Sequence, residues 1–347
     1  MEKSVEENSL GRYLTNSEAC EIASQAFADF GFEPQSRNPR TAFASLLRLG
    51  DGSRSAEDTT FYVVNFMEGG FVVISADRNV INPIYAISDE GQFSQEDENV
   101  QFFMSRTTGG FHRYDSIKTI VNPQRFQLDT IITYHDRFLP TLWSQGAKYN
   151  KFCPILSNGD TAAVGCVAVA MGQTLAYHRR PASIHGYELN WESILASKNL
   201  NLCEWSAIDQ AAHLLRELGT MLNMSYTEMG SAASMYKATS VFKELGFSNV
   251  EYGHDLMKCI ESLKLDGPVP MDGYKSGERY GHAWVADAAK ILLIKHRISI
   301  IADVTEYYLH INWGAAGSNN GYYWVSSDYM QNDILGHNAF YYITGIN

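Results

Sequence analysis

The stretch GCVAVAM, residues 165–171, places a cysteine at the start of a run of small and apolar residues. No glycine or proline interrupts the run before Gly172, and Pro181 stands just beyond its end. This pattern predicts a buried helix over residues 166–178. Cys166 would then lie at or near the helix N-terminus, where the helix dipole and free N–H groups stabilise a thiolate.

Two later motifs add the other groups that a nucleophilic cysteine needs. They are GHAWV at residues 281–285 and HINWG at residues 310–314. In such a site the thiol attacks, an imidazole carries the proton and an amide orients the imidazole. Cys166, His282 and Asn312 are therefore candidate catalytic residues, although a free cysteine taken alone is usually only a small buried hydrophobic residue.

The identity of the catalytic histidine does not follow from its presence alone, because the chain has ten histidines. His178, His185 and His310 are the competitors of His282. The strongest competitor is His310, because residues two apart in a strand share a face and His310 would lie beside Asn312.

Two further residues fit roles around such a site. Gln145 precedes Cys166, and its amide together with the backbone N–H of Cys166 would form an oxyanion hole. Trp313 follows Asn312 and would shield an Asn–His hydrogen bond from water, which strengthens it. Taken alone, the glutamine is typical of a turn and the tryptophan of a core.

The composition is that of a globular protein long enough for two domains: 347 residues, 45% hydrophobic and 19% charged. The formal net charge is −12, and an acidic chain without a basic cluster argues against binding to nucleic acid or anionic membranes. No apolar run approaches about 18 residues, so we expect no membrane span. The five cysteines show no metal-binding spacing, so we expect no metal.

The first ten residues are polar and acidic, which is unlike a signal peptide with its basic start and apolar stretch. Two interpretations stay open at this point. The protein is cytoplasmic, or it is exported and its export signal is absent from this sequence.

The N-terminal third predicts a small α+β module. Residues 16–30 have a helix pattern that ends at Gly31. Residues 61–66 and 71–75 flank a glycine-containing turn and predict a β-hairpin, and 81–87 predict a further strand.

The remainder predicts helices first and strands later, which is typical of an α+β architecture with a helical lobe and a β lobe. A cleft between such lobes would bring Cys166 together with His282 and Asn312. Residues 107–127 predict a linker, in which Lys118 and Arg125 would suit a maturation protease. Besides 166–178, the expected helices are 208–222, 232–245 and 255–263, and the expected strands are 283–286, 291–295, 298–302, 307–312 and 322–326.

Taken together, the motifs resemble the streptopain family of secreted bacterial cysteine peptidases, which are papain-like and made as zymogens. The resemblance covers roughly residues 140–330, and GGFVVISAD at 69–77 also resembles the family propeptide. The matching motifs are Gln145-Gly146, AAVGCVA at 162–168, GSA at 230–232, GHA at 281–283 and HINWG at 310–314.

The resemblance implies an α+β fold: a papain-like two-lobe peptidase with a helical lobe and an antiparallel β lobe, after a small α+β propeptide. Residues 1–125 would be the inhibitory propeptide and 126–347 the peptidase domain. It also implies secretion or a cell-surface location, protein or peptide substrates, the propeptide as a partner in cis, activation by itself or by another protease, and no cofactor.

The resemblance also assigns residue roles. Cys166 would be the nucleophile and His282 the general base and acid. Asn312 and Trp313 would hold and cover the histidine, and Gln145 would complete the oxyanion hole. The substrate would be bordered by Gly281, Ser231 and Ser234.

The sequence departs from the family pattern at three places. Residues 286–306 are longer and more apolar than the usual short hairpin. Ala315 stands where the family usually has a tryptophan, which changes one wall of the expected cleft. Gly172 lies inside the nucleophile helix and would cost about 1 kcal/mol relative to alanine unless something packs there.

Two alternatives to a peptidase use the same residues differently. A Cys/His amidase or acyl transferase would keep the chemistry, but the propeptide-like module argues against it. A catalytically silent binding or inhibitory protein would keep only the fold, and the presence of Cys166, His282 and Asn312 argues against that.

Overall fold

The computed structural model describes residues 13–32, 41–49, 59–78, 80, 82–97, 99–104, 107, 126–134, 139–199, 203–274, 281–296, 303–327 and 340–347. The helices are α2 (Asn16–Asp29), α4 (Cys166–His178), α5 (Trp191–Ile194), α6 (Trp205–Met221), α7 (Met235–Glu244) and α8 (Leu256–Leu265). The strands are β1 (Ala42–Leu49), β2 (Thr59–Phe66), β3 (Phe71–Ser75), β4 (Ile84–Ser88), β5 (Phe126–Tyr134), β6 (Ser183–Ile184), β7 (Tyr187–Glu188), β8 (Ser225–Thr227), β9 (Gly230–Ala232), β10 (Glu251–Gly253), β11 (Val269–Tyr274), β12 (Gly281–His296), β13 (Val304–Asn312), β14 (Gly321–Ser327) and β15 (Tyr341–Thr344).

The chain forms two compact units. Unit 1 comprises Met1–Thr133, Lys290–Leu309 and Ser318–Gly336, and unit 2 comprises Tyr134–Ala289, His310–Gly317 and His337–Asn347. Strands β12 and β13 each run from one unit into the other. Unit 1 therefore combines the N-terminal module with strands from the C-terminal part, and a domain boundary after residue 125 stays a prediction.

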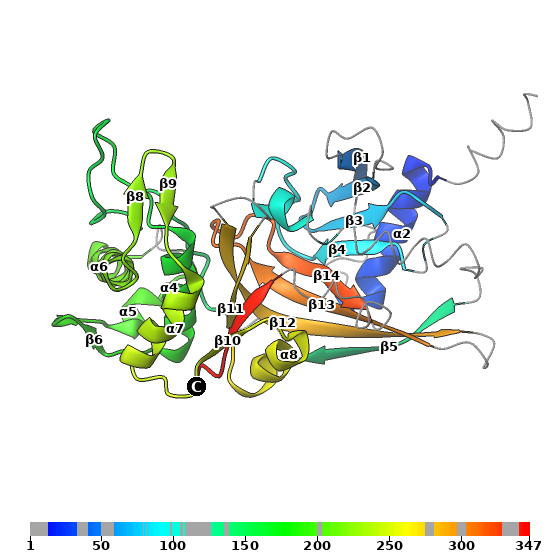
Figure 1. Cartoon of the computed structure of the whole chain (residues 1–347). Helices are drawn as coiled ribbons and strands as arrows, with labels where there is room; N and C mark the ends of the chain where they lie inside the picture. Colours follow the sequence, from blue (N-terminus) through cyan, green and yellow to red (C-terminus); the bar gives the residue numbers. More distant parts are fainter. Residues whose placement is uncertain are drawn as a thin grey trace, which may run out of the picture. The chain divides into compact units, whose positions relative to one another are not determined.

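Helix α2 begins with a complete capping box, because Thr15 accepts from the Glu18 N–H and the Glu18 carboxylate accepts from the Thr15 N–H. It packs against β1, β2 and β3 through a buried face that includes Ala23 and Phe27 (Figure 1). The Phe27 ring meets that of Phe66 on β2 edge-on at 4.8 Å. The helix predicted over 16–30 is confirmed.

The predicted hairpin is also confirmed, as β2 and β3 pair antiparallel around a turn in which Gly69 and Gly70 have φ of 91° and 95°. Strand β4 then pairs antiparallel with β14, with Tyr322 opposite Ile87. A side chain at Gly321 would come within 2.9 Å of the Ile87 carbonyl, so the close approach of these strands requires glycine. The N-terminal sheet thus continues onto a strand from the C-terminal part of the chain.

A buried lysine joins α2 to strand β12 within unit 1. The ammonium of Lys290 donates to the carbonyl of Phe30, the C-cap of α2, at 2.8 Å and to Thr133 Oγ1 at 3.1 Å. It also lies 5.5 and 5.1 Å from the ring centroids of Phe32 and Tyr322. Lys290 therefore ties the C-terminal end of the first helix to the strand.

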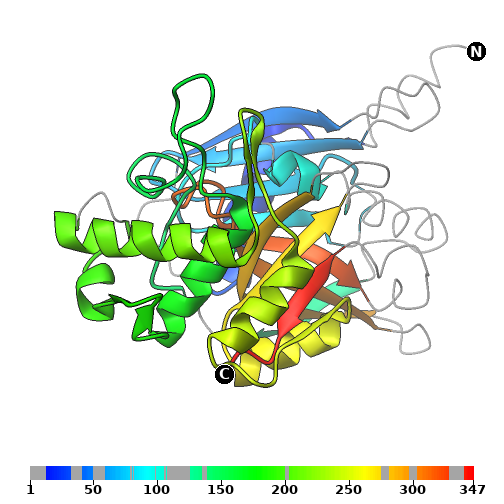
Figure 2. The same cartoon turned by 60° about the vertical axis from the view of Figure 1, so that its left-hand side comes forward.

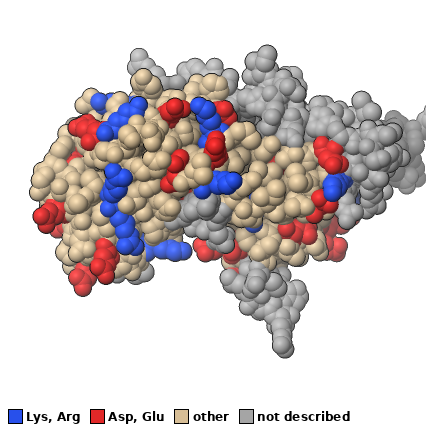
Figure 3. Space-filling model, turned by 90° about the horizontal axis from the view of Figure 1, so that it is seen from below, with Lys and Arg blue, Asp and Glu red and all other residues tan. Residues whose placement is uncertain are grey.

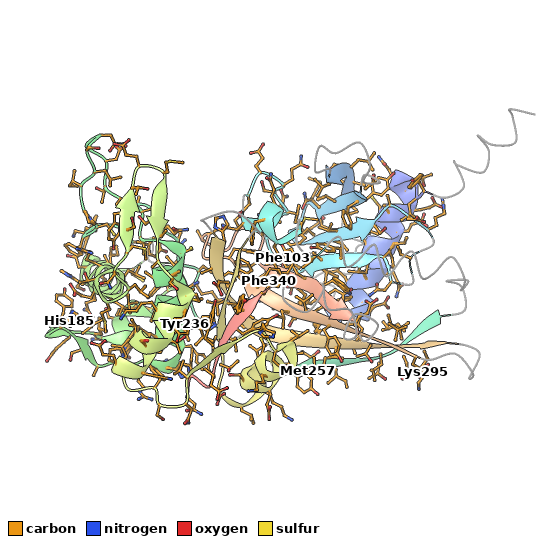
Figure 4. The ribbon with its side chains drawn as sticks, viewed as in Figure 1. Phe103, His185, Tyr236, Met257, Lys295 and Phe340 are labelled. Atoms are coloured by element: carbon orange, nitrogen blue, oxygen red, sulfur yellow. The ribbon has the colours of Figure 1, made fainter. Side chains whose placement is uncertain are left out.

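We expect Lys290→Met to lower the free energy of unfolding by about 1–3 kcal/mol, because the buried Phe30 carbonyl loses its donor. Lys295→Met is the matched control on the same strand, since its ammonium is exposed and pairs only with Asp129 at 3.0 Å among the described residues (Figure 4). Urea denaturation of both variants checks this. Equal midpoints for the two variants would contradict the role of Lys290.

Unit 2 is built around α4, whose residues from Val167 to Ala176 are all buried. Helix α6 lies against α4, and α8 lies against β15 (Figure 2). The side chain that would be added at Gly172 meets Leu215 at 2.7 Å and the Trp143 ring at 3.1 Å. This packing explains the glycine that the sequence places inside the helix.

Two expectations differ from the structure. The strands predicted over 283–286 and 291–295 are one continuous strand, β12, because Asp287 and Lys290 find buried partners instead of forming a break. Residues 126–127, assigned to the linker, belong to β5. The rest of that linker after residue 107, with Lys118 and Arg125, and the strand predicted over 298–302 lie outside the described residues.

Candidate active site

Cys166 begins helix α4 directly after a glycine turn. Gly165, the N-cap residue, has φ of 92° and ψ of 133° and provides no side-chain cap. A Cβ there would lie 2.7 Å from Met224 Cε and 3.2 Å from the Ser231 carbonyl. Only glycine fits this turn without strain, and the turn fixes where the thiol begins its helix.

The thiol of Cys166 lies in a largely desolvated setting. Burial raises the pKa of Cys166 above its ordinary value, and the carboxylate of Asp272 adds to this rise. Hydrogen bonds from the backbone of Ala283 and Val167 act in the opposite direction and favour the thiolate. In this state of the chain, burial outweighs the backbone donors at the helix N-terminus.

His282 lies at the start of β12 and is half-buried. In the antiparallel pairing with β11 it stands opposite Gly273, and Ala283 stands opposite Asp272. Helix α4 contacts β11, and β11 pairs with the His282 end of β12. The backbone of Ala283, the residue next to His282, also favours the Cys166 thiolate and lowers its pKa. The sequence offered no signal for Asp272, which the strand pairing brings to this place.

Asn312 is buried at the end of β13 and is engaged by neighbours other than His282. Its Nδ2 donates to the Thr141 carbonyl at 3.0 Å. Its Oδ1 accepts from the Gly314 N–H at 3.0 Å and from Gln173 Nε2 at 3.2 Å. Both lone pairs of the amide oxygen are therefore used, and orientation of His282 by Asn312 stays a prediction.

Trp313 is buried and packs on the strand that carries His282. Its ring lies 5.3 Å from that of Trp284, and Trp284 lies 5.6 Å from Phe340, which Figure 4 labels just before β15. Trp284 follows His282 by two residues and shares its face of β12. The aromatic layer thus lies beside the histidine, as a covering role would require.

Gln145 is half-buried in the loop that precedes the nucleophile helix. Its backbone carbonyl accepts from the Val164 N–H at 3.0 Å, so the loop is tied to the turn in front of Cys166. No described residue makes a hydrogen bond to its side-chain amide. Its role as a donor to the oxyanion stays a prediction.

The residues predicted to border the substrate lie at different places in unit 2. Ser231 on β9 donates to the Ala163 carbonyl at 2.6 Å and so holds the β8–β9 hairpin against the turn before Cys166. Ser234 is the exposed N-cap residue of α7. Gly281 is the first residue of β12, next to His282. Their contact with substrate stays a prediction.

The competing histidines lie far from Cys166 along the helix or are paired with a carboxylate. His178 ends α4, at the opposite end from Cys166. His185, labelled in Figure 4, lies in the β6–β7 hairpin, and its Nδ1 is 2.6 Å from Glu217 Oε2. His310 is buried with its Nδ1 2.5 Å from Asp287. Of the candidates, His282 is the one whose segment meets the Cys166 thiol.

His178 makes stability depend on pH. Burial, with a smaller contribution from the charge of Arg180, lowers its pKa from 6.5 to about 4. Neutral His178 therefore stabilises the fold fully above pH 6.5, and this contribution is lost as the pH falls toward 4, by up to about 3 kcal/mol. We expect His178→Phe to reduce the loss of stability between pH 7 and pH 4.5, measured by urea unfolding. An unchanged loss would contradict this assignment.

Other features of the described residues bear on possible partners. No three His, Cys, Asp or Glu side chains among them come together as a metal site. None of the helices in these ranges is long and apolar enough to span a membrane. On the face in Figure 3, the described basic and acidic side chains are interspersed.

The sequence matches the Peptidase C10 family over residues 143–323, which hold Gln145, Cys166, His282 and Asn312. The chain belongs to the Peptidase C10 family. Residues 11–108 match the Spi protease inhibitor family, and they contain α2 and β1–β4. A peptidase sequence thus follows an inhibitor-like one in a single chain.

Individual relatives of this C10 peptidase agree with that assignment. Streptopain from Streptococcus pyogenes is 22% identical, in an alignment covering 87% of each protein. The thiol protease/hemagglutinin PrtT from Porphyromonas gingivalis is 23% identical over 54% of this chain and 23% of PrtT. The prointerpain A fragment from Prevotella intermedia has a similar fold, with a TM-score of 0.60, 19% identity and coverage of 88% of this chain and 99% of that one.

These findings confirm the α+β fold with a papain-like peptidase part and a propeptide. They also show that the protein is a cysteine peptidase made as a zymogen, with proteins as its substrate class. The predicted likeness to the streptopain family is confirmed.

Proposed function

We propose that this C10 peptidase is a secreted cysteine endopeptidase in which Cys166 is the nucleophile, His282 the general base and acid, and Gln145 a donor to the oxyanion. The observation that carries the proposal is that α4, which begins at Cys166, contacts β11, the strand that pairs with the His282 end of β12. The backbone of Ala283, next to His282, also favours the Cys166 thiolate and lowers its pKa. The similarity to streptopain supports the location outside the cell.

Hydrolysis runs through a thioester. The Cys166 sulfur attacks the amide carbon while its proton passes to His282, and the carbonyl oxygen becomes an oxyanion. The Gln145 amide and the Cys166 backbone N–H stabilise this oxyanion. The imidazolium of His282 protonates the leaving amine as the C–N bond breaks. Water then loses a proton to His282, attacks the thioester and releases the acid, and the proton returns to the thiol.

The N-terminal segment keeps the enzyme latent until it is cut from the peptidase part. The match of residues 11–108 to the Spi protease inhibitor family supports this role. The cut falls within residues 105–130, and either the enzyme itself or an external protease makes it. Residues 1–125 are the propeptide in this proposal.

Selective alkylation tests the nucleophile. The chain has five free cysteines, and Cys203 is the internal control. It is half-buried like Cys166, but among the described residues its thiol makes hydrogen bonds only to backbone carbonyls. With a limiting amount of iodoacetamide, Cys166 of the processed protein should be alkylated faster than Cys203, and activity should fall in parallel with Cys166 alkylation. Equal alkylation of both cysteines, or full activity after Cys166 is alkylated, would contradict the proposal.

Blocked peptides test the reaction type. An endopeptidase cleaves inside a peptide that is acetylated at its N-terminus and amidated at its C-terminus, and mass spectrometry would find two fragments, one ending in a free carboxylate. Transfer of the acyl fragment to an added amine as the main product would favour an acyl transferase instead. Loss of the C-terminal amide alone would favour an amidase.

A further inference from the structure

Two buried side-chain amides link the nucleophile helix to strand β13. Gln173 on α4 is fully buried, and its Nε2 donates to Oδ1 of Asn312 at 3.2 Å. Gln173 stands two turns along the helix from Cys166, on the helix that carries the nucleophile. Nearly every other buried residue of this helix is apolar. Burying an amide costs free energy unless the amide is hydrogen-bonded, so the hydrogen-bond partners of Gln173 matter as well as its packing.

The same two amides hold the segment that leads to Gln145. Gln173 Oε1 accepts from the Thr141 hydroxyl and from the Trp143 N–H, both at 3.1 Å. Asn312 Nδ2 donates to the Thr141 carbonyl at 3.0 Å. Each amide is thus hydrogen-bonded to the segment that leads to Gln145. Thr141 is bonded through both its side chain and its backbone.

Both backbone polar groups of Trp143 are hydrogen-bonded. The Ala316 N–H donates to the Trp143 carbonyl at 3.1 Å, so the turn after Asn312 holds the far side. Two residues later the Gln145 carbonyl accepts from Val164, close to Cys166 in the chain. The loop is therefore fixed before and after Ser144 by elements that also carry catalytic candidates.

We propose that Gln173 is a positioning residue that, together with Asn312, sets the place of the oxyanion donor Gln145 relative to Cys166. This rests on the proposed role of Gln145. Gln173 touches neither substrate nor the reacting atoms. Helix α4 carries both the thiol, at its N-terminus, and the Gln173 amide, which anchors the loop that bears Gln145. Stabilisation of the transition state by the Gln145 amide depends on the exact position of that amide.

The test separates oxyanion stabilisation from thiol reactivity. Alkylation of Cys166 by iodoacetamide forms no oxyanion, whereas a blocked peptide aldehyde adds to the thiol and leaves its oxygen at the oxyanion position. For Gln173→Met we expect kcat to fall by about 10–100-fold with KM near the parent value, because a misplaced donor weakens the transition state. Aldehyde affinity should fall by a similar factor, and the alkylation rate should stay near that of the parent.

Three further variants make the result decisive. Thr174→Val is the matched control, because Thr174 is the adjacent buried polar residue and bonds only its own helix at Ala170, 2.9 Å away, among the described residues. It should leave both the aldehyde affinity and the alkylation rate close to the parent. Thr141→Val keeps the size but removes the hydroxyl that donates to Gln173 Oε1, so it should give a smaller effect of the same kind even where Gln173→Met fails to fold. Gln145→Ala removes the donor itself.

The outcomes are distinct. If Gln145→Ala weakens aldehyde binding but the folded Gln173 and Thr141 variants do not, the positioning role is wrong. It is also wrong if alkylation falls as much as kcat, because a general structural defect would explain both. If Gln145→Ala itself leaves aldehyde affinity unchanged, the proposed oxyanion hole fails first.

Discussion

Peptide hydrolysis by the processed protein should fall by about 10⁴-fold or more when either Cys166 or His282 is replaced by alanine. Without the thiol no thioester forms, and without the imidazole no group carries the proton to the leaving amine. The double variant should lose little more than either single variant, because the two residues act as a unit. Initial rates on one blocked peptide, with each variant processed by the same added protease, measure this.

Cys203→Ala is the matched control for that experiment. It removes another half-buried thiol of the same unit and should leave the rate near that of the parent. Additive losses in the double variant would mean that Cys166 and His282 do not share one step. Nearly full activity of the His282→Ala protein would mean that another histidine is the general base.

Gly165→Ala should damage both folding and catalysis. The turn has φ of 92°, which an L side chain rarely adopts, so strain alone should cost about 1–3 kcal/mol. The new methyl group would also press on the Ser231 carbonyl at 3.2 Å and on the mobile end of Met224. Relief of this contact shifts the N-terminus of α4, and we expect kcat to fall by about 10–100-fold as Cys166 moves.

Urea unfolding and kinetics on Gly165→Ala check these two effects. Gly253→Ala is the matched control, because a Cβ at Gly253 meets no atom within 4 Å and its backbone is not left-handed. The control should change the free energy of unfolding by less than about 0.5 kcal/mol. If Gly165→Ala behaved like the control, the turn would not need glycine.

The nucleophile helix was predictable because its signal is local. An apolar run and the proline beyond it mark Cys166–His178, and the structure has these bounds. The reason for Gly172 was not predictable, because the groups that fill its place, Leu215 and Trp143, come from other segments. A helix pattern shows which residues are buried but not what buries them.

Strand β12 shows the limit of local patterns more clearly. Asp287 and Lys290 suggest a break between two strands, yet His310 and the Phe30 carbonyl satisfy them inside the fold. The same limit applies to the candidate site. In the sequence, Gln173 is one polar residue on an apolar helix. In the structure it makes three hydrogen bonds, to Thr141, Trp143 and Asn312, and a fourth bond from Asn312 to Thr141 closes the network.

Measurement of intact mass shows whether this chain is a cysteine peptidase zymogen that acts through Cys166. The parent and Cys166→Ala are incubated separately under reducing conditions, and Cys166→Ala is also mixed with a trace of processed parent. We expect the parent to shorten to a form that begins within residues 105–130. Cys166→Ala alone stays whole and is cut at the same place in the mixture. Processing of Cys166→Ala alone at the parent's rate would contradict the claim.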